Sequence, residues 1–247
     1  MTEIEVEFKN QHDVIGDIKT SVGKVLKIAT AFNFRGQADF AWTIKPKLTR
    51  GKELLSVEQL LEIEKENIRS FEEEQKDYIW SFRDKKRGYL NDWYLIMQAR
   101  HMDYETRLID WTPCINTAIW MAMDYNEKDE PQNMDKDGVL YLYPNNFNMV
   151  FDDDAKYIDP YQLRHFCQIY PTIYWDGIET GKGLRRMSRQ IGKFFIAANE
   201  DIKKPMEDIC EELLKLKIPK EIKQILHKDF QSRGLTYERI YFPEYEL

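Results

Sequence analysis

The chain has 247 residues, of which 43% are hydrophobic and 32% are charged, and its formal net charge is −7. The apolar fraction is sufficient for a substantial core and excludes an intrinsically disordered chain. The negative charge argues against a protein that mainly binds phosphate backbones, and no apolar run reaches the ~18 residues of a membrane span.

The N-terminal part of the chain predicts a strand, a helix and a second strand. Glu3 to Phe8 alternates polar and apolar residues, as a half-buried strand does, and apolar residues from Ile15 to Leu26 recur at helical spacing. The β-prone segment Ile28 to Phe34 leads into Arg35 and Gly36, where glycine would allow a turn or a close backbone approach. We therefore expect Arg35 near a strand end.

The middle of the chain predicts helices. Ser56 to about Lys85 carries an apolar stripe with charged residues between its members, which indicates an amphipathic helix. A second helix is expected from about Leu90 to His101. A third should begin with Thr112 as N-cap and Pro113 at the first helical position, and its alanines would permit close packing against a sheet.

The second half predicts buried strands and closing helices. Val139 to Tyr143 is the clearest candidate for a central strand, and Phe194 to Ile196 indicates another. Two helices, from about Pro205 to Leu216 and from Pro219 to Ser232, are expected to close the fold.

This order of elements predicts an α+β fold with small, mainly antiparallel sheets, packed helices and a helical insertion. We expect one domain over residues 1–247, with the insertion at about 52–88. Three widely spaced cysteines and an N-terminus without a basic and apolar leader favour a reduced, cytoplasmic setting. The four histidines are dispersed, so we expect no metal site.

Two segments place polar side chains among core-forming residues. The first runs from Asn33 to Gln37 and continues at Trp42 to Pro46, and the second runs from His101 to Thr112. Polar groups framed in this way become partly buried, and burial requires partners. The sequence therefore predicts a pocket around these groups.

The order of several short motifs resembles that of the FRG domain family, a bacterial and poorly characterised family. The motifs are Phe34-Arg35-Gly36-Gln37, Trp42 with Pro46 and Arg50, His101, Thr106 to Thr112, Ala118, and Arg186 with Gln190, Gly192 and Phe194. The C-terminal Gly234 and Phe242-Pro243 resemble the closing signature of that family. The chain departs from it at Arg100 to Glu105, where the family usually reads Gln-His-Tyr-Gly-hydrophobic-Pro, and at Glu244, where aspartate is usual.

A looser similarity to the layout of ADP-ribosyltransferases implies NAD as a substrate. In such enzymes a strand-end arginine holds the phosphates and a carboxylate stabilises an oxocarbenium-like transition state. The candidate catalytic residues are Asp110, His101, Glu200 and Glu244. The candidate ligand-binding residues are Arg35, Gln37, Trp42, Thr106, Arg107, Trp111, Arg186, Gln190 and Phe194.

Structural roles compete with these assignments. Arg35 and Asp110 could form a buried ion pair that fixes the fold, and His101 could interact with a helix C-terminus. Thr112 could act as a helix cap, and the tryptophans and phenylalanines could belong to the core.

Two main functional hypotheses follow. The first is an NAD-using or nucleotide-modifying enzyme, acting as a bacterial toxin or a phage-defence effector. The second is a non-catalytic module that uses the same pocket to bind a nucleotide or a nucleic-acid end. Nucleic acid is not favoured by the net charge, although a local basic patch can exist on an acidic protein. A nuclease is a weaker third hypothesis, since it would need clustered carboxylates and a metal ion. Protein partners are unknown and no membrane partner is expected.

Overall fold

The computed structural model describes residues 2–6, 8, 13–25, 32–76, 88–126, 128–144, 149–150, 156–165, 167–169 and 192–237. Its strands form two four-stranded sheets. The first has the order β1 (Thr2–Ile4), β8 (Leu214–Ile218), β4 (Gly138–Pro144) and β2 (Phe32–Gln37). The second has the order β3 (Ile109–Trp111), β7 (Lys193–Ile196), β6 (Cys167–Ile169) and β5 (Met149–Val150). The pairs β1–β8 and β5–β6 are parallel and the other pairs are antiparallel.

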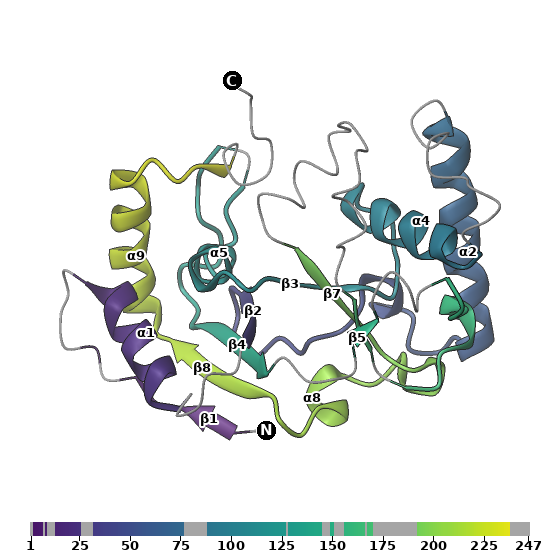
Figure 1. Cartoon of the computed structure of the whole chain (residues 1–247). Coiled ribbons are helices and arrows are strands. Elements are labelled where there is room, and N and C mark those ends of the chain that lie inside the picture. Colours follow the sequence, from purple (N-terminus) through teal and green to yellow (C-terminus); the bar gives the residue numbers. More distant parts are fainter. Residues whose placement is uncertain are drawn as a thin grey trace.

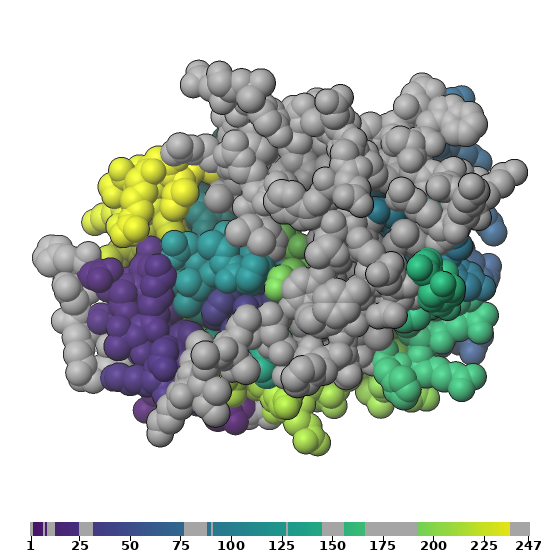
Figure 2. Space-filling view, in the orientation of Figure 1, coloured from purple at the N-terminus to yellow at the C-terminus, as the bar shows by residue number. Residues whose placement is uncertain are grey.

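The helices lie in two groups. Figure 1 shows α1 (Val14–Val25) and α9 (Lys220–Ser232) together at one end of the molecule, and α2 (Val57–Glu74) and α4 (Leu90–His101) together at the other. The short helices α5 (Ile115–Met121) and α8 (Met206–Ile209) lie between them. Figure 2 shows α1 and α9 side by side on the molecular surface. Helices and sheets together make an α+β fold, as the sequence predicts.

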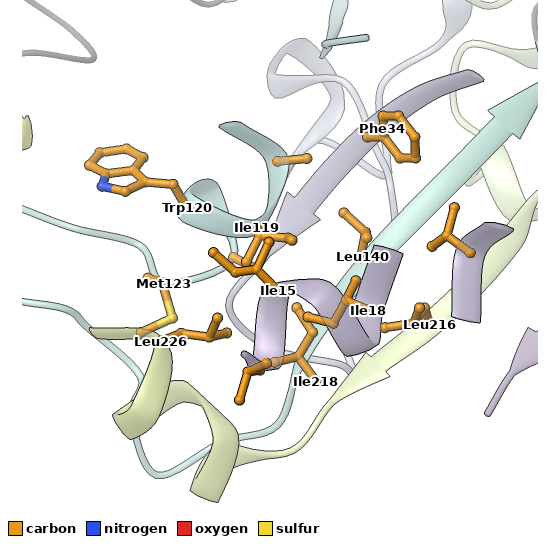
Figure 3. Packing of buried hydrophobic residues seen from close by; sticks show 14 of the residues in the cluster. Ile15, Ile18, Phe34, Ile119, Trp120, Met123, Leu140, Leu216, Ile218 and Leu226 are labelled. Atoms are coloured by element: carbon orange, nitrogen blue, oxygen red, sulfur yellow. The ribbon is translucent and has the colours of Figure 1, made fainter. Parts of the chain in front are cut away.

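Alternation along β4 explains how the first sheet is covered on both faces. Leu140 and Leu142 pack with residues of α1, α5 and α9, and these include Ile15, Ile18, Ile119 and Leu226 (Figure 3). Val139, Tyr141 and Tyr143 point to the opposite face and pack with Ile109, Trp111 and Phe195 of the second sheet. Successive side chains of a strand face opposite sides, so one strand contributes to two cores.

The second sheet is covered in the same way. Phe195 packs toward the first sheet, whereas its neighbours Phe194 and Ile196 join a core formed largely by α4 and the end of α2. The order of layers is therefore helices, first sheet, second sheet, helices.

The two sheets also meet at one backbone bridge. The amide of Phe34 in β2 donates to the carbonyl of Thr112 at 2.6 Å, and the amide of Thr112 donates back to Phe34 at 2.9 Å. This bridge brings Arg35, one residue after Phe34 in β2, near Asp110 of β3, which lies two residues before Thr112.

Several sequence predictions for the elements are confirmed. β4 is central, α4 spans the expected residues, and α2 begins after Ser56, whose side chain forms a capping box with Gln59. Gly234 follows the C-cap of α9 and has φ 62°, the left-handed conformation that glycine adopts at that position.

Other predictions are wrong. The expected helix from Pro205 to Leu216 is the short α8 followed by β8, in which Leu216 and Ile218 are buried and Lys217 is exposed. The strand expected over 3–8 ends at Ile4. The helix expected to start at Thr112 has Cys114 as its N-cap, because Thr112 is held in the bridge to β2.

Candidate functional site

A cavity of about 230 Å³ lies where the end of β2 meets β3 and the ends of α4 and α5. Its lining residues are Arg35, Gly36, Gln37, Ala38, Trp42, Arg50, Arg100, His101, Asp103, Asp110, Met121 and Asp124. These residues come from segments that are distant in the sequence.

The register of β2 determines which of its side chains reach the cavity. Arg35 and Gln37 pair with Tyr141 and Val139 of β4, whose side chains face the second sheet, so both point to that side. Gly36 points the other way, toward α5, where a Cβ would lie 1.8 Å from the carbonyl oxygen of Ala118. Glycine at this position lets β2 pack directly against the backbone of α5.

Asp110 joins Arg35 and Arg100 at the cavity. Nη1 of Arg35 donates to the backbone oxygen of Asp110 at 2.6 Å, and Nη2 of Arg100 donates to the Asp110 carboxylate. Among the described residues, Nε of Arg35 and Nε of Arg100 have no hydrogen-bond partner. Each guanidinium therefore has one buried N–H group that no described residue satisfies.

Arg50 adds a third guanidinium, from the segment after the 3-10 helix Lys47–Thr49. Burial lowers the pKa of Arg35 to about 10, Asp110 opposes this change, and the charges of Arg50 and Arg100 add to it. Arg50 is exposed as a residue, but partial desolvation of its guanidinium group, together with the charge of Arg100, lowers its pKa. The positive charges are close enough to lower the pKa of Arg35 and of Arg50, and the negative charge of Asp110 acts against this effect at both residues.

The imidazole of His101 completes this side of the cavity. His101 is the last residue of α4 and is buried, and its ring meets the ring of Phe194 edge to face at 5.3 Å between centroids. The sequence pattern placed His101 at a helix end, and the structure agrees.

Trp42 stands at the rim of the cavity with 44% of its surface exposed. Hydrogen bonding fixes the backbone at Trp42. The hydroxyl of Tyr141 lies 3.1 Å from the Trp42 carbonyl oxygen and 3.1 Å from Oε1 of Glu207. The Glu207 carboxylate also accepts from the amide of Ile44 at 3.0 Å. An exposed indole on an anchored backbone can stack on a flat ring.

Two aspartates at helix ends complete the lining. Asp103 follows α4 with φ 68° and Asp124 follows α5 with φ 52°. Lys47 pairs with the Asp103 carboxylate at 2.8 Å, and Nδ2 of Asn133 donates to Asp124 at 3.1 Å.

Comparison with known proteins gives one match. Residues 30–131 match the family model for the FRG domain. The resemblance to the FRG domain family that the sequence motifs predict is confirmed over these residues. No curated protein and no solved structure matches the chain. The matched residues include the motif Phe34-Arg35-Gly36 and every residue that lines the cavity.

The structure brings together five of the residues that the sequence suggests for the site. They are Arg35, Gln37, Trp42, His101 and Asp110. The cavity also contains Arg50, which the sequence suggests only as part of a motif, and Arg100, which belongs to no motif that predicts a site. The position of Arg100 directly before His101 at a helix end was the available signal.

Other suggested residues lie elsewhere in the described structure. Arg107 is fully buried and donates to the Glu64 carboxylate, to Oδ1 of Asn199 and to the carbonyl of Pro160, each at 2.7 Å. Thr106 is also fully buried, and its hydroxyl accepts from the amide of Leu108 at 3.3 Å. Neither residue lines the cavity.

The aromatic candidates Trp111 and Phe194 and the acidic candidate Glu200 also lie outside the cavity lining. Trp111 stacks on Phe195 in the core between the sheets, at 4.6 Å between centroids, and Phe194 belongs to the core against α4. Glu200 is exposed in the 3-10 helix Asn199–Asp201, away from the cavity. Arg186, Gln190 and Glu244 lie outside the described residues.

The described part of the chain contains neither a membrane-spanning helix nor a metal-binding cluster. None of its helices combines the length and the apolar character needed to cross a bilayer. Within the same residues, no three side chains of His, Cys, Asp or Glu gather in a way that could hold a metal ion.

Proposed function

We propose that the cavity binds the phosphate of a nucleotide and that the protein is an NAD-using enzyme of the ADP-ribosyltransferase kind. The observation that supports this proposal is the gathering of three guanidinium groups, those of Arg35, Arg50 and Arg100, with the Asp110 carboxylate in the lining of one cavity. Guanidinium forks match phosphate oxygens better than point charges do.

The charged lining suits an anionic ligand. Arg35, Arg50 and Arg100 line the cavity together with Asp103, Asp110 and Asp124, so the lining itself has equal numbers of positive and negative groups. Asp103 already pairs with Lys47 at 2.8 Å. The three guanidinium groups therefore face two carboxylates that lack this lysine partner, and a phosphate would supply further negative charge.

In the proposed reaction, the Asp110 carboxylate stabilises the positive charge that develops on the ribose. When the bond between C1′ and the nicotinamide nitrogen of NAD breaks, its electron pair leaves with nicotinamide and positive charge develops on the ribose. A fixed carboxylate stabilises that charge, and water or another acceptor then attacks C1′ and releases a proton. Asp110 is the candidate carboxylate that shares the cavity with Arg35.

The size of the cavity limits what it can enclose. Its volume of about 230 Å³ is below the roughly 300–1,000 Å³ of typical small-molecule sites. It suits one phosphate with its sugar, and the exposed ring of Trp42 offers a surface for a base outside it.

Nicotinamide release from NAD by the purified protein tests this function. We expect release from the wild-type protein and a loss of about 100-fold or more in Arg50→Ala and Asp110→Asn, the scale expected for removal of one electrostatic group. Arg50 is exposed, so its removal should leave the circular dichroism spectrum unchanged. Arg69→Ala is the matched control, because Arg69 lies on the surface of α2 and pairs with Glu66. Absence of nicotinamide release from the wild-type protein would reject the enzyme.

A non-catalytic nucleotide-binding module is the second candidate. It is favoured by the ion pair with Arg100, which already neutralises the Asp110 carboxylate. Such a module should show a rise in melting temperature with NAD or ADP-ribose, lost in Arg50→Ala, without any turnover.

A further inference from the structure

Gln37 is a buried amide in the cavity lining with an unsatisfied acceptor. It is 6% exposed, and its Oε1 has no hydrogen-bond partner among the described residues. Its partner across the sheet is Val139, whose side chain lies in an apolar core and offers no hydrogen bond. Buried amides are nearly always hydrogen-bonded, and a ligand in the cavity can supply the missing partner once the Gln37 side chain turns toward it.

We propose that Gln37 recognises a ribose hydroxyl of a 5′-phosphorylated ribonucleotide whose phosphate is held by Arg35, Arg50 and Arg100. This inference rests on the proposed phosphate site and adds the sugar that the site selects.

The position of Gln37 relative to Arg35 supports a sugar hydroxyl. The two residues lie on the same face of β2, two positions apart, which corresponds to roughly 6.6 Å along a strand. This separation is comparable to the span from a 5′-phosphate to the 2′ and 3′ hydroxyls of its own ribose, whereas the polar edge of the base lies farther away.

The chemistry of the hydroxyl group also fits. A hydroxyl can donate to the amide oxygen and can accept from the amide nitrogen, so it matches either end of the Gln37 side chain. The amine of a base could also donate to Oε1, so the short separation from the phosphate site is what favours the sugar over the base. A ribose with its phosphate also agrees with a cavity of about 230 Å³.

Isothermal titration calorimetry with AMP, 2′-deoxy-AMP, 3′-deoxy-AMP and adenosine tests the inference. For the wild-type protein we expect at least one deoxynucleotide to bind about tenfold more weakly than AMP, which corresponds to one lost hydrogen bond. Adenosine should bind far more weakly because it lacks the phosphate. Gln37→Leu should bind AMP and both deoxynucleotides with equal affinity.

The outcomes separate this inference from the proposed function. Equal binding of AMP and both deoxynucleotides to the wild-type protein would overturn the role of Gln37 and leave the phosphate site standing. Absence of AMP binding combined with nicotinamide release from NAD would also overturn it while the enzyme proposal survives. Absence of both would reject the two together. The comparison of ligands on the wild-type protein holds even if Gln37→Leu does not fold.

Discussion

Gly36 of β2 touches the backbone of Ala118 in α5 so closely that no larger residue fits between them. A Cβ at Gly36 would lie 1.8 Å from the Ala118 carbonyl oxygen and 2.6 Å from the amide nitrogen of Ala122. Both obstacles are backbone atoms of a helix, which cannot rotate away as a side chain would. The glycine of the motif Phe34-Arg35-Gly36 therefore fixes how deeply β2 sits against α5, and Arg35 enters the cavity from that strand.

We predict that Gly36→Ala destabilises the protein by at least about 3 kcal/mol, the upper end of ordinary overpacking, because α5 must move. Urea unfolding followed by circular dichroism measures the change. Gly23→Ala is the matched control: Gly23 is an exposed position of α1 with no atom within 4 Å of the added Cβ. This variant should gain about 0.5–1 kcal/mol, because alanine favours a helix over glycine. Equal stability of Gly36→Ala and the wild-type protein would contradict the close contact.

Removing one partner of the buried pair between Arg107 and Glu64 should cost about 3–5 kcal/mol, because the other charge remains buried alone. The two side chains are 1% and 0% exposed and 2.7 Å apart. The pair joins α2 to the segment just before β3, so its loss should also loosen the wall of the cavity formed by Asp110. Chemical denaturation of Glu64→Gln and Arg107→Met gives the free energies of unfolding.

The pair between Lys65 and Glu62 on the surface of α2 is the control for this measurement. Their side chains are 37% and 65% exposed, and such pairs contribute about 0–1 kcal/mol. If Glu62→Ala and Glu64→Gln changed stability equally, the burial of the Arg107 pair would be refuted.

The sequence predicts which polar side chains are buried more reliably than it predicts the residues with which they interact. Both Arg35 and Arg107 sit among apolar residues, which correctly indicated that each is at least partly buried. Only the fold shows that Arg107 pairs with Glu64, 43 positions away in α2. Only the fold shows that Arg35, in contrast, lines a cavity. A local pattern contains no information about which distant element supplies the counter-charge.

The same limit explains the errors in the fold. Residues 205–216 were expected to be helical because of their charged and apolar composition, yet Leu214, Leu216 and Ile218 alternate with Lys215 and Lys217. This period of two marks a strand, and it forms the neighbour of β4 in the first sheet. Sheet membership is decided by pairing across the chain, and β8 pairs with both β1 and β4.

Stability should fall on acidification partly through His227 of α9. Burial lowers the pKa of His227 below its usual 6.5, and the hydroxyl of Tyr125 lies 2.9 Å from Nδ1. The unfolded chain then binds protons more readily than the folded protein does, so the contribution of His227 is complete above pH 6.5 and is lost as the pH falls through the folded-state pKa. We expect the melting temperature to drop less between pH 7.5 and pH 5 in His227→Gln than in the wild-type protein. Parallel pH profiles would show that His227 is not the responsible group.

Glu207→Ala should both destabilise the protein and weaken ligand binding. The carboxylate of Glu207 accepts from the amide of Ile44, a fully buried residue, and lies 3.1 Å from the hydroxyl of Tyr141. Without it the buried amide loses its partner, at a cost of about 1–3 kcal/mol, and the backbone that carries Trp42 loses an anchor. Exposed Glu211, four residues further along the chain, provides the control Glu211→Ala, for which we expect no change. Thermal unfolding measures stability, and fluorescence titration with ADP-ribose measures binding. A Glu207→Ala protein with normal stability and undiminished affinity would show that the Trp42 segment holds its position without this carboxylate.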